Sequence, residues 1–180
     1  MPGALIQIRH ALKPDGLMLA SMLGGDTLNE LRLALIEAES ELTGGAGLRV
    51  APFADLQDIA GLLQRAGFAL PAADRDVLTV HYAEPMRLLA DLRAMGETAA
   101  LAERSPRGLS RRILARAFDI YRARFSDAEG RVRATFEVLT ATGWAPHDSQ
   151  HKPLKPGSAQ ARLADVLRTT EQSAGEKPNR

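Results

Sequence analysis

One short apolar segment, Leu17–Leu23, carries the clearest pattern of the chain. Turn residues bound it on both sides, with the tripeptide Pro14–Gly16 before it and a glycine pair at Gly24-Gly25 after it. A run of this length that is apolar on both faces is typical of a strand buried in a parallel sheet with helices above and below. The pattern therefore predicts a central strand with a helix before it and a helix after it.

Apolar residues at helical spacing predict the longer helices of the chain. One helix ends near Leu12, a second follows the first strand as far as Gly44, and the others cover Asp55–Ala66, Pro85–Met95 and Leu109–Phe125. At the start of the second helix, Thr27 and Glu30 match a capping box, in which each side chain bonds to backbone N–H groups of the first turn. We therefore expect Asp26 or Thr27 to cap this helix.

Two further regions have the composition of strands. Phe68–Leu70 begins one that Pro71 is expected to stop, and Val77–Tyr82 alternates as an edge-like strand. In Arg131–Trp144, apolar and polar residues alternate, which predicts a long strand with one solvated face, antiparallel rather than parallel. The polar positions of this alternation are Arg131, Arg133, Thr135 and Glu137. Helices and strands in this order predict an α/β fold.

The composition of the chain excludes several kinds of binding site and catalytic residue. The chain has 180 residues and a formal charge of +1, so no bulk charge predicts binding to nucleic acid or to an anionic membrane. The absence of cysteine excludes a thiolate metal site and a cysteine nucleophile. No apolar run in the sequence approaches the roughly 20 residues that a membrane-spanning helix needs. The arginine-rich face of Leu109–Phe125 is interrupted by acidic residues, which favours a solvated or protein-docking face over a nucleic-acid site.

Several sequence motifs resemble a known family. The pattern A-L-x-x-I-x-x-x-L-K-P-D-G-L-x-L-A and the later L-L-x-R-A-G-F are similar to the second half of class I S-adenosylmethionine-dependent methyltransferases. The segments M-L-G-G-D-T-L-x-E-L-R, V-A-P-F-A-D-L-Q-D-I-A-G-L-L-Q-R-A-G-F and G-W-A-P-H-D-S-Q-x-K-P resemble one subgroup more closely. This subgroup contains the arginine hydroxylase that assists assembly of mitochondrial respiratory complex I and bacterial malonyl-acyl-carrier-protein O-methyltransferase-like proteins. The resemblance extends over nearly all of residues 2–160.

The resemblance implies a fold and a function for the chain. It implies the C-terminal half of a doubly wound, Rossmann-like methyltransferase sheet, made of strands five to seven with flanking helices. No G-x-G-x-x-G motif occurs, so the cofactor half is expected to be absent and Met1 is expected to be a misplaced start. Leu17–Leu23 would then lie at an open sheet edge, which exposes it to association with another strand.

The implied activity belongs to full-length relatives. These would use S-adenosylmethionine to modify a small molecule, an acyl-carrier protein or a protein arginine, by methyl transfer or by hydroxylation. This chain alone is expected to bind no cofactor and to be inactive. The alternative is a non-catalytic assembly or interaction module related to respiratory complex I assembly factors. The expected location is the cytoplasm of a bacterium, or the mitochondrial matrix in a eukaryote.

Candidate pocket residues fall in three places. By the geometry of the resembled fold, the carboxyl end of the first strand would border a substrate pocket, although its residues also suit a plain turn and cap. The end of the edge-like strand and the irregular segment after the last strand are further candidates, against simple surface or packing roles. The candidates are Gly24, Gly25, Asp26, Thr27, His81, Tyr82, Trp144, His147 and Gln150.

No metal site is predicted. His147 and His151 are four residues apart, but Pro146 and Pro153 disfavour the helix that would align them. The methyltransferase-like domain is expected to end at residue 156. A polar tail over residues 157–180 follows, with a short helix and then disorder.

Overall fold

The structure is a computed structural model that describes residues 2–97, 108–151, 158 and 161–170. Its elements in chain order are α1 (Pro2–Ala11), β1 (Leu17–Leu23), α2 (Asn29–Thr43), α3 (Leu56–Ala66), β2 (Ala69–Tyr82), α4 (Pro85–Ala94), α5 (Arg111–Phe125), β3 (Val132–Trp144) and α6 (Leu163–Leu167). The predicted α/β class is confirmed.

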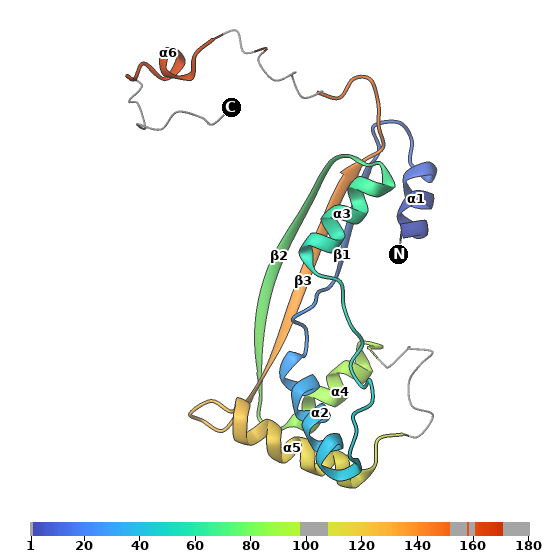
Figure 1. Cartoon of the computed structure of the whole chain (residues 1–180), viewed down its shortest axis with the longest axis vertical. Helices are drawn as coiled ribbons and strands as arrows, with labels where there is room; N and C mark the ends of the chain where they lie inside the picture. The colour runs from blue at the N-terminus through green and yellow to red at the C-terminus, as the bar shows by residue number, and fades with distance from the viewer. Residues whose placement is uncertain (1, 98–107, 152–157, 159–160, 171–180) are drawn as a thin grey trace. The chain divides into compact units, whose positions relative to one another are not determined.

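The strands form one antiparallel sheet in the order β1-β3-β2, shown side by side in Figure 1. Among the described residues β1 therefore pairs on one side only, as expected for a strand at an open edge. The prediction that this strand is central and buried in a parallel sheet is wrong for this chain. Its single neighbour is antiparallel, and Leu17 and Leu19 are 50% and 66% exposed because nothing in the described part of the chain covers that face.

Strand β2 continues through Pro71, which corrects the prediction that this proline ends a short strand. The pairing with β3 shifts between Ala69 and Ala72, and Leu70 has a left-handed φ of 48°. This irregularity places Pro71 in a bulge of an edge strand, where its missing N–H need not remove a ladder hydrogen bond.

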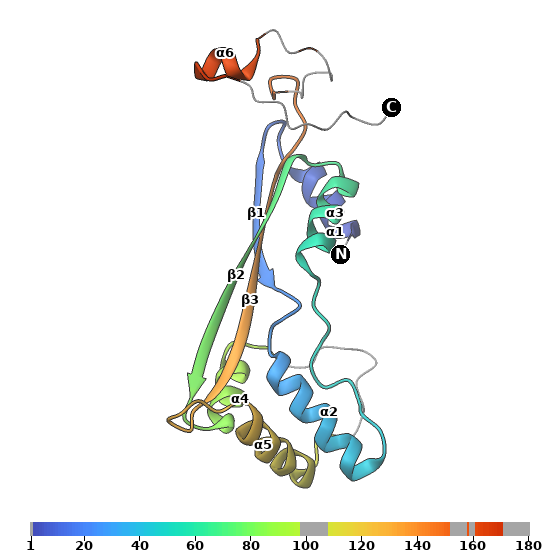
Figure 2. The same ribbon diagram turned by 60° about the vertical axis from the view of Figure 1, so that its left-hand side comes forward.

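Two hydrophobic clusters pack on opposite faces of β3. Val132 and Ala134 belong to a cluster with α2, α4 and α5, whereas Leu139 and Ala141 belong to a cluster with α1 and α3. Because successive residues of a strand point to opposite faces, the even and odd positions serve different helix groups. Figure 2 shows α1 and α3 beside one end of the strands and α2, α4 and α5 at the other end.

This arrangement corrects the prediction of one solvated face along β3. The covered face changes midway, so Glu137 is buried although it continues the polar alternation of Arg133 and Thr135. The alternation of residues within one strand cannot reveal this change. The change depends on where helices from other parts of the sequence pack against the strand.

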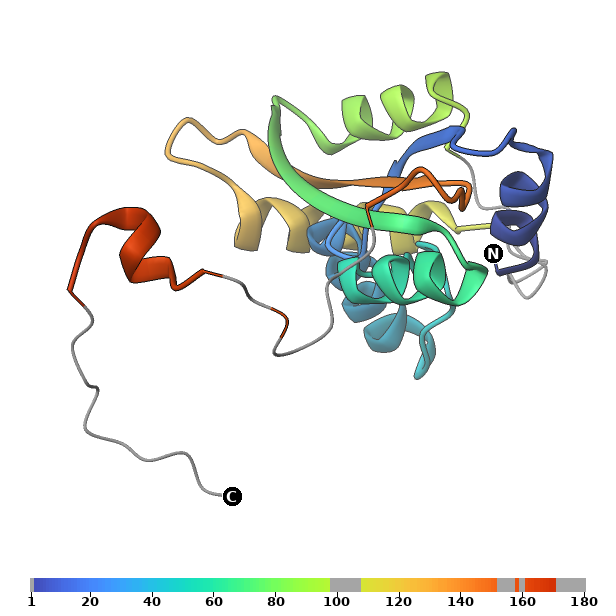
Figure 3. The same ribbon diagram turned by 90° about the horizontal axis from the view of Figure 1, so that it is seen from above.

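Capping residues in the local sequence set the two ends of α3. Asp55 caps α3 by accepting from the Asp58 N–H at 2.7 Å, and Gly67 ends this helix with a φ of 79°. Helix α1 packs against α3, as the view from above in Figure 3 also shows. Helix α5 pairs with α2 through Arg116 and Glu41 at 2.6 Å. A second ion pair joins Arg124 to Glu37, so part of the arginine face docks within the protein.

Residues 148–180 form a second unit, which contains α6. The predicted domain boundary at residue 156 falls outside the described residues, and so does the predicted disordered segment Thr169–Arg180 from residue 171 onward. Across the described part of the chain, every helix is too short or too polar to cross a lipid bilayer.

Candidate functional site

The carboxyl end of β1 continues to bond to β3 after the regular pairing ends. The Gly24 N–H donates to the carbonyl of Glu137 at 2.8 Å, and the Leu28 N–H donates to the carbonyl of Thr135 at 2.7 Å. The loop between these two residues therefore runs along the edge of β3 and extends the contact between β1 and β3 in an irregular form. It leads directly into α2, whose first residue is Asn29.

Thr27 is fully buried, and its hydroxyl provides hydrogen bonds to the backbone of β3 that a neighbouring strand would normally provide. Its hydroxyl accepts from the Glu137 N–H and donates to the Glu137 carbonyl, each at 3.1 Å. One side chain thus satisfies both backbone groups of a buried residue in β3.

Glu30 performs the same task one step further along β3. Its carboxylate accepts from the Thr135 N–H at 3.1 Å and from the Thr135 hydroxyl at 2.6 Å. The predicted capping box is therefore wrong. The residue before α2 is Leu28 in a left-handed conformation (φ 55°) with no side-chain cap, because Thr27 and Glu30 bond to β3 instead.

Gly24 is required by close packing. A Cβ atom at this position would lie 2.7 Å from Cδ of Glu137 and 2.8 Å from Cγ of Leu139. Gly25 has more space, with the carbonyl of Ala54 3.9 Å from its Cβ position. The glycine pair thus lets the chain turn against the sheet.

Glu137 is the buried centre of this cluster, with 4% of its surface exposed. One carboxylate oxygen accepts from the Asp26 N–H at 2.6 Å, and the other lies 3.3 Å from Nε of Arg75. Arg75, half exposed on β2, also lies 3.5 Å from the carboxylate of Asp26. A buried carboxylate is tolerable only when it is paired and hydrogen-bonded, and this one is both.

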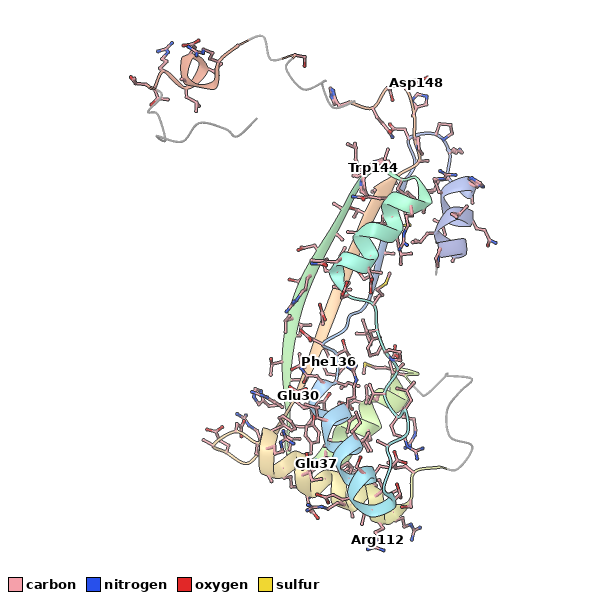
Figure 4. The ribbon with its side chains drawn as sticks, in the orientation of Figure 1. Glu30, Glu37, Arg112, Phe136, Trp144 and Asp148 are labelled. Carbon is pink, nitrogen blue, oxygen red and sulfur yellow. The ribbon has the colours of Figure 1, made fainter. Side chains whose placement is uncertain are left out.

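Arg133 repeats the arrangement beside Glu30, at 3.5 Å from that buried carboxylate. Each arginine has a half-exposed side chain above a nearly buried acid. Guanidinium groups carry several hydrogen-bond donors in a fixed geometry, so the two arginines offer positive charge and directed hydrogen bonds for binding. Figure 4 shows Glu30 and Phe136 near the junction of the strands with the lower helices.

The structure separates the other candidates from this loop. His81 lies opposite Arg133 in the ladder, four residues from Glu137, which corresponds to about 14 Å along the strand. Tyr82 lies one residue further, opposite Val132. The two residues thus do not share the position of Gly24–Thr27.

His81 has an acidic neighbour that its spacing in the sequence does not reveal. Its Nε2 lies 3.9 Å from the carboxylate of Asp127. Partial burial would raise the pKa of Asp127, but hydrogen bonds and charge from Arg131 hold that pKa below its ordinary value. Burial and the nearby Asp91 raise the pKa of Tyr82, so its hydroxyl stays protonated at neutral pH.

The third group of candidates lies at or beyond the opposite end of β3. Trp144 is half-buried opposite Leu17 and Ala69, seven residues from Glu137 (Figure 4). His147 is exposed at the end of the first unit, and Gln150 belongs to the second. Among the described residues, no three histidine or acidic side chains are grouped to hold a metal ion.

Comparison with known proteins gives the family context. Arginine-hydroxylase NDUFAF5 of Danio rerio is 41% identical over 166 residues, and that of Homo sapiens is 38% identical over 166 residues. Malonyl-[acyl-carrier protein] O-methyltransferase of Halorhodospira halophila is 37% identical over 145 residues. The chain is a homologue of these proteins. This confirms the resemblance that its sequence motifs indicate, although no family model matches the chain.

The matched region covers most of this chain but only about half of each relative. It spans 92% of this chain and 51% of the Danio rerio protein, and 80% of this chain and 47% of the Halorhodospira halophila protein. The chain therefore spans about half the length of the curated relatives it matches.

Sequence reasoning missed the buried members of the cluster. Glu30 and Glu137 were assigned to a helix cap and a solvated face, whereas both lie under arginines at the carboxyl end of β1. The signal that was available is the glycine pair itself, because glycine before a helix permits close approach to a neighbouring strand.

Proposed function

We propose that this chain is the C-terminal half of an S-adenosylmethionine-dependent methyltransferase-like domain, the half that carries substrate contacts. The observation that carries the proposal is homology over 92% of this chain and only 51% of a relative. The open edge of β1 supports it, since a larger sheet would continue from that edge.

The loop Gly24–Thr27 is the proposed border of the substrate pocket. In open α/β sheets, ligands collect at the carboxyl ends of strands, and this loop follows the carboxyl end of β1. Thr27 and Glu137 fix the loop to β3, while Asp26 and Arg75 stand at its surface. The names of the relatives suggest two substrate classes for this chain, an acyl-carrier protein or a protein arginine, and a small molecule is the third class that we propose.

The described residues do not fit S-adenosylmethionine itself. A cofactor turn needs glycines that leave room for a ligand, but Gly24 is packed against Glu137 and Leu139. We therefore derive no chemical step through the cofactor for this chain, and its binding is assigned to the remaining part of the longer relatives.

The second candidate function is a non-catalytic assembly or interaction module. The exposed Leu17 and Leu19 at a free strand edge favour it, because such edges recruit other chains. The proposed location is the bacterial cytoplasm, or the mitochondrial matrix if the source is eukaryotic.

Calorimetry with S-adenosylmethionine tests the proposal on the 180-residue chain. We expect no measurable binding, because the sequence contains no glycine-rich cofactor turn, whereas the O-methyltransferase of Halorhodospira halophila is the control that we expect to bind. Binding to this chain with a Kd in the micromolar range, about −8 kcal/mol, would contradict the proposal.

A further inference from the structure

Helix α5 carries five arginines, all of them exposed, and they divide into two groups. One group faces α2: Arg116 lies 2.6 Å from Glu41, and Arg124 forms an ion pair with Glu37. The second group forms no ion pair with any residue that the structure describes. Its members, which we call the α5 arginine face, are Arg111, Arg112 and Arg122.

Helical spacing places these three arginines on one side of α5. Arg111 and Arg122 are eleven residues apart, which is close to three full turns, and Arg112 follows Arg111 directly. On this side, the exposed residues between Arg111 and Arg122 are Ala115 and Asp119. A single carboxylate therefore faces three guanidinium groups, and the α5 arginine face has a net positive charge.

The first turn of α5 has a charge that opposes helix stability. Arg111 and Arg112 are its first two residues, directly after the capping Ser110, and the turn contains no acidic residue. The N-terminus of a helix has a partial positive charge, so acidic side chains stabilise it and arginines do the opposite. Exposed residues that oppose local stability are typical of functional positions. The two arginines therefore indicate a binding role.

We propose that the α5 arginine face docks the acidic surface of a carrier protein that presents the substrate. The inference rests on the proposed function, which includes two substrate classes that a protein carries. Complementary charge selects between them. A positive face attracts an acidic acyl-carrier protein, whereas it repels a protein segment that presents an arginine.

The distance from the loop Gly24–Thr27 also suits a carried substrate. Glu41 follows Thr27 by 14 positions, nearly all of them in α2, so it lies about 20 Å away along the helix. Arg116 contacts Glu41, and Arg112 lies one turn of α5 beyond it, as Figure 4 shows for Arg112 relative to Glu30 and Glu37. A small substrate cannot contact the loop and this face together. A carrier protein can, because it holds its acyl group on a flexible arm.

Fluorescence anisotropy tests the proposal with the 180-residue chain and the labelled acyl-carrier protein of Halorhodospira halophila as the probe. The double variant Arg111→Glu/Arg112→Glu should bind the probe at least about tenfold more weakly at low ionic strength. Its melting temperature should stay the same or rise, because acidic residues suit the first turn of a helix. Arg122→Glu, at the other end of the face, should weaken binding as well.

The matched control is Lys13→Glu/Arg87→Glu. It changes the net charge by the same amount at two exposed positions outside α5, and Arg87 also lies in the first turn of a helix. We expect it to change the affinity by less than about threefold. Equal losses for the two double variants would overturn the docking face, because bulk charge would then explain the binding.

No binding of the probe to the unmodified chain would also overturn the docking face. This experiment contains no S-adenosylmethionine, so its failure is distinct from a failure of the proposed function, which cofactor binding tests. Tighter binding of a peptide that presents an arginine than of the carrier protein would reverse the assignment of the partner.

Discussion

Thr27→Val is expected to lower the free energy of unfolding by about 1–3 kcal/mol. Valine has nearly the same shape as threonine but has no hydroxyl, so the Glu137 N–H would lose its partner, whereas the Glu137 carbonyl would keep the Gly24 N–H. This N–H belongs to a buried residue, and an unsatisfied buried polar group costs about 1–3 kcal/mol. Urea denaturation at one fixed protein concentration, with the slope compared between variants, measures the change.

Two control variants separate the hydroxyl from general packing. Thr27→Ser keeps the hydroxyl and removes one methyl group, so a loss of only about 1 kcal/mol is expected. Thr142→Val removes a solvent-exposed hydroxyl of the same strand and should change stability by less than about 0.5 kcal/mol. If Thr27→Ser costs as much as Thr27→Val, the hydroxyl does not substitute for a strand.

Leu139→Ala should destabilise the protein by about 2–5 kcal/mol. Leu139 is fully buried on the face of β3 that α1 and α3 cover, among Ile59, Leu63 and Met18. Removing its isopropyl group leaves a cavity that the surrounding helices fill only in part. Thermal or urea unfolding of the purified variant gives the value.

Leu78→Ala provides the comparison for that prediction. Leu78 lies in an edge strand of the same sheet but is 54% exposed, so its truncation should cost less than about 0.5 kcal/mol. Equal losses for the two variants would mean that the helices do not cover the odd-numbered face of β3 as described here.

The local elements of the fold could be predicted from the sequence. Leu17–Leu23 is punctuated by turns on both sides, and Gly67 ends α3 where expected, because both signals depend only on neighbouring residues. The predicted resemblance also proved to be homology. Features that depend on other parts of the chain could not be predicted, such as which face of β3 the helices cover at each point.

The cluster around Glu137 illustrates that limit. From the sequence alone, Thr27 and Glu30 suit a helix cap, and Glu137 suits solvent. Only the approach of the loop to β3, made possible by Gly24, brings these side chains to the same strand edge. Likewise, nothing in the sequence shows that His81 lies about 14 Å along the strand from Glu137, because the pairing register joins His81 to Arg133, 52 positions away.

The most direct test of the half-domain proposal joins the chain to what it is proposed to lack. The matched part of the Halorhodospira halophila O-methyltransferase is replaced by this chain, and S-adenosylmethionine binding is measured by calorimetry beside the relative and the 180-residue chain. We predict that the chimaera binds within about tenfold of the relative, about 1.4 kcal/mol, while the chain alone gives no signal. A chimaera that is folded by circular dichroism but does not bind would contradict the account.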